Sequence, residues 1–160
     1  MATITNKEIE NMIGLFETRK LPKEKWTHQS HLIAAVWYLM KYPQNKVFNI
    51  LSENIIEYNK SVGTANSNTS GYHETITWFW LNEVQKFLDK KKYKSIVLAC
   101  KNIINSNLVN RQYPLTFYSE RLLFSSEARK ELLMPDLAVP FTINSRFLVR
   151  GDIIESKKEE

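Results

Sequence analysis

The sequence feature that most constrains the fold is a long apolar run near the N-terminus. Residues 32–40 read LIAAVWYLM and include no charged side chain. Thr27 precedes the run at a good N-cap position, so a helix is expected over 28–41. Such a helix would be apolar on nearly all sides, which is typical of a helix buried at the centre of a domain. The run is far shorter than the roughly 20 residues that cross a bilayer.

Four other segments show the spacing of amphipathic helices. The first begins with Thr5 and Glu8, which form a capping-box pattern. In each segment apolar residues recur three and four positions apart. With the central helix, the five expected main helices are 6–20, 28–41, a third that Pro43 opens, 72–90 and 93–106. The sequence therefore predicts an all-α fold, a compact helical bundle.

The C-terminal third is expected to add one or two short helices and an extended tail. Pro114 is a favoured first-turn residue, and another helix is expected to start after Ser125 or Ser126 and to stop before Pro135. Proline, glycine and β-branched residues make 137–154 an extended segment. We expect one helical domain over residues 1–155, followed by a disordered charged tail at 156–160.

A polar segment, 59–71, interrupts the helical pattern. Val62 is its only aliphatic residue larger than alanine. Loops of this length are uncommon in compact domains and often serve as lids or binding loops. The alternative is a tolerated flexible connection. Either way the segment should be mobile, and it should lie beside His73, into which it leads.

Charge and cysteine content narrow the class of protein. The net charge is +5, and much of the excess lies in 86–94, where Asp89 is the only acid. This pattern is typical of a solvated helix end, and no arginine-rich face with interleaved aromatic residues suggests nucleic-acid binding. Cys100 is the only cysteine, so no intrachain disulfide can form. Without a recognisable signal segment, we expect a cytoplasmic protein that binds neither nucleic acid nor membrane.

The chain has three histidines, and all of them fall at expected helix starts. His28 and His31 are three residues apart and so share one helix face. His73 opens another helix, and we expect it to converge with them on one divalent metal ion. Zinc, nickel, manganese and iron all suit imidazole and carboxylate ligands. Glu74, which follows His73, would be a further ligand or a general base.

Several other residues are candidates for substrate contacts or for supporting the ligands. They are Tyr72, Tyr118, Arg121, Arg129 and Asp136. An arginine can bind an anion through two parallel hydrogen bonds, and an aspartate can ligate a metal. The alternative for the arginines is surface ion pairing, for Asp136 a turn, and for Tyr72 capping or packing.

The site has a second interpretation without a metal. Helix N-termini carry positive partial charge, which disfavours a cation and favours a carboxylate or phosphate. Neutral imidazoles and free backbone amides at the same positions would then hold a small anion. A third interpretation makes the histidines hydrogen-bonded cap or core residues.

Two segments together resemble a family of small bacterial helical proteins to which we can assign no activity. They are the aromatic-x-His-x-x-His-Leu segment at 26–32 and the Tyr-His-Glu-Thr-x-Thr segment at 72–77. The resemblance continues into 118–119, 128–129 and 135–136. It implies that these segments form one shared functional site, but it names neither a metal nor a substrate.

The sequence thus leaves three functional hypotheses. The first is a metal-binding protein or a metal-dependent enzyme such as a hydrolase, acting on small molecules, anionic ones included. The second is a non-catalytic protein that binds a small anion or other ligand between the same helices. The third is an interaction module in which the histidines are structural. The oligomeric state is left open.

Overall fold

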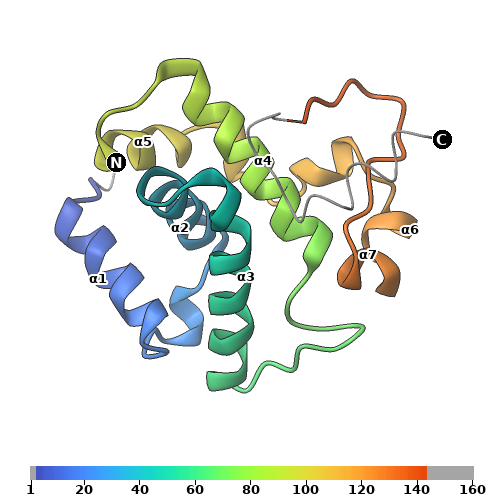
Figure 1. The fold of residues 1–160 in the computed structure, drawn as a ribbon, viewed down its shortest axis with the longest axis horizontal. Helices are drawn as coiled ribbons and strands as arrows, with labels where there is room; N and C mark the ends of the chain where they lie inside the picture. The colour runs from blue at the N-terminus through green and yellow to red at the C-terminus, as the bar shows by residue number, and fades with distance from the viewer. Residues whose placement is uncertain (1–2, 144–160) are drawn as a thin grey trace.

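The described part of the chain, residues 3–143 of a computed structural model, is all-helical (Figure 1). No strand occurs in this range. The five long helices are α1 (Asn6–Glu17), α2 (His28–Lys41), α3 (Gln44–Ser61), α4 (Glu74–Lys91) and α5 (Ile96–Ile103). Two short helices follow, α6 (Glu120–Leu123) and α7 (Ser126–Lys130). The prediction of an all-α bundle with five main helices is confirmed.

Side-chain caps start most of these helices. In α1 the Glu8 amide donates to Thr5 Oγ1 at 3.2 Å, and the Thr5 amide donates to Glu8 Oε2 at 2.7 Å, which completes the predicted capping box. Thr27 caps α2 by accepting from the Ser30 amide. Serines cap the later helices: Ser95 for α5, Ser119 for α6 and Ser125 for α7. Local sequence therefore determines where these helices begin.

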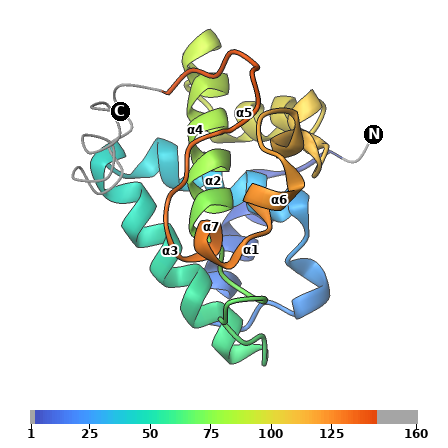
Figure 2. The ribbon, with the colours of Figure 1, turned by 90° about the vertical axis from the view of Figure 1, so that its right-hand side faces the viewer.

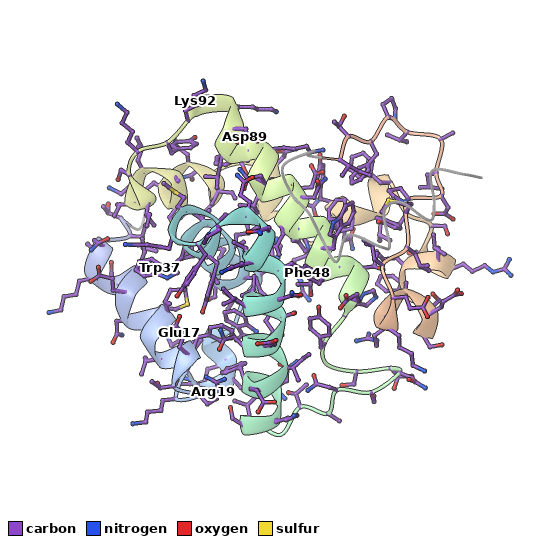
Figure 3. The ribbon with its side chains drawn as sticks, in the orientation of Figure 1. Glu17, Arg19, Trp37, Phe48, Asp89 and Lys92 are labelled. Atoms are coloured by element: carbon purple, nitrogen blue, oxygen red, sulfur yellow. The ribbon has the colours of Figure 1, made fainter. Side chains whose placement is uncertain are left out.

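Helix α2 lies at the centre of the molecule, as its apolar run predicted. It packs against α1, α3, α4 and α5, and Figures 1 and 2 show it enclosed by them. Its core side chains are almost fully buried: Leu32, Ile33, Ala34, Ala35, Val36, Tyr38 and Leu39. The hydroxyl of the buried Tyr38 has a partner, because it donates at 2.7 Å to Glu17 at the end of α1. Glu17 is labelled in Figure 3.

Helix ends differ from the expected ones where the backbone turns early. Helix α1 ends at Glu17 rather than at residue 20, and Arg19 just beyond it has a positive φ of 60°. Helix α4 ends at a left-handed Lys92, labelled in Figure 3. Pro114 lies in a 3₁₀ turn, Tyr113–Thr116, rather than in an α-helix.

The C-terminal part of the described chain runs back along α4 (Figure 2). The Thr75 hydroxyl donates to the Glu131 carbonyl at 2.7 Å and accepts from the Leu133 amide at 3.0 Å. Residues 137–143 contain no helix, in line with the extended segment expected there. The rest of that segment, the domain limit at 155 and the tail at 156–160 lie outside the described residues.

Within residues 3–143, no helix is both long and apolar enough to span a bilayer.

Candidate functional site

A cavity of about 370 Å³ lies between α2, α3 and α4. Small side chains of α2, Ala34 and Ala35, form one wall, and Leu51 and Ile55 of α3 form another. Ile76, Thr77 and Trp80 of α4 and the loop between α3 and α4 complete it. Among residues 3–143, Lys23 is the only lysine, arginine or acid that lines it. Ligand pockets are commonly 300–1,000 Å³ and mainly apolar with a few placed polar groups, and this cavity fits that description.

The loop between α3 and α4 is held in place beside the cavity by Asn66. The Asn66 Oδ1 atom accepts from Asn59 Nδ2 at 2.9 Å and from the Tyr72 amide at 3.0 Å. The Asn66 Nδ2 group donates to the Ile56 carbonyl at 3.1 Å. Asn66, although exposed, thus ties the loop both to α3 and to the residue that precedes His73 and α4. Val62, Thr64 and Gly71 of this segment line the cavity together with His73, so the loop does lie beside His73 as predicted.

Arg129 also anchors the loop, from α7. Its Nη1 group donates to the carbonyls of Gly71 at 2.9 Å and Tyr72 at 3.3 Å. Both of these hydrogen bonds go to backbone carbonyls. Arg129 therefore holds the cavity wall in place but does not line the cavity.

His31 borders the cavity with one ring nitrogen available to a ligand. Nδ1 lies 2.6 Å from the Thr27 carbonyl, and because a carbonyl can only accept, Nδ1 carries the proton. Nε2 is then an acceptor, and no residue of the described chain hydrogen-bonds it. The His31 side chain is exposed at the cavity edge, but protein atoms packed around the ring displace water and lower the pKa of His31 below 6.5. At neutral pH His31 is a neutral acceptor.

Aromatic packing fixes the His31 ring. Its centroid lies 4.0 Å from that of Trp26, which in turn stacks on Phe16 at 4.4 Å and meets Tyr58 at 5.5 Å. The Tyr58 hydroxyl donates to the Leu21 carbonyl at 3.0 Å. The Thr27 carbonyl and the Trp26 indole together hold the His31 ring in one orientation, so its Nε2 acceptor is fixed in position for a ligand.

His73 is a structural residue with both ring nitrogens occupied. Nδ1 accepts from the Ile76 amide at 3.2 Å, which makes His73 the N-cap of α4. Nε2 donates to the Leu123 carbonyl at 2.8 Å. Burial lowers the pKa of His73 to about 4, and the side chain is only 7% exposed. The helix therefore begins at Glu74 rather than at Tyr72, because the histidine itself caps it.

His28 faces a second cavity, of about 660 Å³, near the first turn of α2. Its Nε2 donates to the Leu108 carbonyl at 2.9 Å, and its ring lies 4.6 Å from the Trp80 ring. Burial lowers the pKa of His28 from 6.5. Nδ1 is then left as the acceptor. This cavity is more polar, since Arg111, Gln112 and Glu120 also line it.

Glu74 and Tyr72 lie side by side near the first turn of α4. The Tyr72 hydroxyl donates to Glu74 Oε2 at 2.8 Å, and Glu74 is only 4% exposed. Tyr72 lines the apolar cavity, whereas Glu74 is absent from the walls of both described cavities. The catalytic role predicted for Glu74 stays a prediction, and its position is that of a buried partner of Tyr72.

Two of the remaining candidates hold the C-terminal segment in place. The Tyr118 hydroxyl donates to the Leu133 carbonyl at 2.8 Å, and this side chain is fully buried. Asp136 accepts from the Ser119 amide at 2.7 Å and from its hydroxyl at 2.6 Å. Arg121 is exposed on α6 and borders neither cavity.

The structure does not gather the three histidines as metal ligands. Among residues 3–143, no group of three or more His, Cys, Asp or Glu side chains is placed to hold an ion. His73 would have to break its bonds to Ile76 and Leu123 to ligate one. Only His28 and His31 keep an acceptor nitrogen. Metal binding stays a prediction, which elemental analysis of protein purified without a histidine tag would test.

Sequence reasoning missed three residues that line the cavities. Trp80 lies in an apolar helical pattern that is typical of core packing, and Trp26 opens the segment 26–32, yet both border the two cavities. Arg111 lies in the irregular segment between α5 and α6, where no periodic pattern marks a role. The only available signal for Trp26 was its place in the segment 26–32 that also holds two histidines.

Comparison with known proteins adds no relative from which a function can be inferred. No protein-family model matches the chain, and no curated protein or solved structure matches it significantly.

Proposed function

We propose that this chain binds a small, mainly apolar organic molecule between α2, α3 and α4, and that His31 orients it. The observation that carries the proposal is the cavity of about 370 Å³ with a neutral imidazole acceptor at its edge. A dry cavity of about 150 Å³ is enough to bind benzene. The larger volume here has room for a ring and its substituents.

Polar contacts in this site are few, which favours an apolar ligand with a hydrogen-bond donor. Trp26, Ile55 and Trp80 supply apolar and aromatic surface, while Nε2 of His31 offers an acceptor for an O–H or N–H group. A bound molecule would cover Nε2 of His31, and leaving a covered polar group unpaired is costly, so the acceptor selects for molecules that carry a donor.

A pair of neutral probes tests the proposal, 2-phenylethanol and ethylbenzene, which differ by one hydroxyl group. Binding is measured by isothermal titration calorimetry and by the shift in melting temperature. Both probes should stabilise the protein, because a ligand that binds only the folded state does so. 2-Phenylethanol should bind more tightly. His31→Phe, which keeps a ring on Trp26, should remove that difference.

A cavity-filling variant locates the binding. Ala35→Leu adds a side chain on the α2 wall and should abolish binding of both probes, whereas Ala138→Leu, at an exposed position outside the cavity, should leave it unchanged. The proposal is wrong if neither probe binds the unaltered protein, or if Ala35→Leu and Ala138→Leu bind the probes equally well.

A further inference from the structure

We propose that the bound molecule is an apolar α-amino acid. Its side chain lies in the apolar cavity between α2, α3 and α4. Its charged groups lie beside Arg111, Glu120 and His28 in the second cavity, here called the polar cavity, near the first turn of α2. This inference rests on the proposed function and names the class of ligand.

The two cavities adjoin, so one molecule can occupy parts of both. Trp26, His31, Ile76 and Trp80 line the apolar cavity and the polar cavity alike. An α-amino acid suits such a pair of spaces, because its apolar group and its two charged groups branch from a single carbon atom.

The polar cavity carries one positive and one negative side chain that do not pair with each other. Arg111 and Glu120 both line it, and the ion pairs found within residues 3–143 join other residues. A guanidinium group binds a carboxylate through two parallel N–H bonds. A carboxylate such as that of Glu120 accepts from an ammonium group. The cavity thus offers a partner for each end of a zwitterion.

The two imidazoles favour a zwitterion over a simple anion. His28 donates through Nε2 to the Leu108 carbonyl, and His31 donates through Nδ1 to the Thr27 carbonyl. Each ring is left with an acceptor nitrogen, and both residues line the polar cavity. Acceptors match the three N–H groups of an ammonium, whereas a phosphate or a lone carboxylate would bring further acceptors against them.

Calorimetry with a defined panel tests the ligand class. The panel contains L-leucine, L-methionine, L-phenylalanine, L-tyrosine and L-tryptophan, with three analogues of phenylalanine: phenethylamine, 3-phenylpropionate and 2-phenylethanol. At least one amino acid should bind. For phenylalanine, each analogue that lacks a charged group should bind roughly tenfold more weakly or worse, since each removes a paired charged group.

Each other outcome overturns the inference in a distinct way. If 3-phenylpropionate binds as tightly as phenylalanine, the ligand is an anion, and if phenethylamine does, it is a cation. If no amino acid binds while 2-phenylethanol does, the inference fails and the proposed function stands. If nothing in the panel binds, both fail.

Variants with matched controls assign the two charged groups. Arg111→Gln should weaken the binding of phenylalanine and 3-phenylpropionate but not that of phenethylamine. Glu120→Gln should weaken the binding of phenethylamine but not that of 3-phenylpropionate. Arg121→Gln and Glu127→Gln change exposed residues that border neither cavity, and they should leave all affinities unchanged. If Arg111→Gln and Arg121→Gln behave alike, Arg111 does not bind the carboxylate and the inference is wrong.

Discussion

His73 links helix capping, tertiary packing and the candidate site at a single residue. It caps α4 through Nδ1, joins α4 to the end of α6 through the Leu123 carbonyl, and forms part of the cavity wall. The cap needs the neutral ring, because Nδ1 must be unprotonated to accept from the Ile76 amide, whereas Nε2 can donate to Leu123 in either state. Its protonation state therefore connects solution pH to the stability of the fold.

Stability should fall as pH drops below neutral because of His73. The folded-state pKa is about 4, whereas the unfolded value is near 6.5, so the unfolded chain takes up the proton first. The loss begins near pH 6.5, and the contribution of His73 should reach about 3 kcal/mol of unfolding free energy near pH 4. Urea titrations across this range measure it.

His73→Asn provides the control for this pH dependence. Asparagine is a good N-cap and does not titrate, so the variant keeps the cap and loses the bond to Leu123. It should be less stable at pH 7, and its stability should depend less on pH between 4 and 6.5. An unchanged pH slope would show that another group causes the acid sensitivity.

Three glycines should respond differently to alanine. At Gly71, which has φ of +76°, a Cβ atom would lie 2.4 Å from the Ala65 carbonyl oxygen. Gly71→Ala should cost roughly 2 kcal/mol or more. Gly63 has the same φ but open space, so Gly63→Ala should cost about 1 kcal/mol. Gly14 lies inside α1 with open space around it, so Gly14→Ala should stabilise the protein by roughly 0.5–1 kcal/mol.

Thermal unfolding of the three variants measures this order. Equal effects of alanine at Gly63 and Gly71 would contradict the close approach of Gly71 to the Ala65 carbonyl.

At the scale of elements, the C-terminal segment secures the end of α4 that carries the site. Thr75 bonds to backbone on both sides of Leu132, and Arg129 of α7 holds the carbonyls of Gly71 and Tyr72. These contacts join segments more than 50 residues apart in the chain. The loop wall of the cavity thus depends on α7 as well as on the helices that flank it.

Arg129→Ala should loosen the loop between α3 and α4. Removing hydrogen bonds from a charged donor should destabilise the protein by about 1–2 kcal/mol. Amide exchange across 64–70 should become faster, because the loop would lose its hydrogen bonds to α7. Lys130→Ala, at the exposed neighbouring position, is the control and should leave the exchange unchanged. Equal exchange in the two variants would show that Arg129 does not anchor the loop.

At the scale of the whole molecule, α2 makes the fold depend on all its main helices. It contacts α1, α3, α4 and α5, so removing any of them would expose apolar surface on α2. The same central position places its first turn, with His28 and His31, next to both cavities.

Unfolding should therefore be a single cooperative transition. Tryptophan fluorescence reports on the fully buried Trp78 and on the cavity residues Trp26 and Trp80, while circular dichroism reports on the helices. Because the helices share one core, the two signals should give the same midpoint in urea. Separate midpoints would show that part of the bundle unfolds independently.

Local sequence by itself determined the helices of this protein. The Thr5–Glu8 capping box, the Thr27 cap and the apolar run at 32–40 act over a few residues, and each has its expected effect in the structure. Burial of α2 at the centre follows from the same run, because a helix without a polar face has no stable place at the surface.

Only the tertiary structure decided what the histidines do. The ring of His28 is bonded to Leu108, 80 residues away, and that of His73 to Leu123, 50 residues away. Spacing along a helix shows that two imidazoles share a face, but it cannot show which distant carbonyl takes the ring proton. The apolar cavity is likewise bounded by side chains from separate helices, so it exists only once α2, α3 and α4 have packed together.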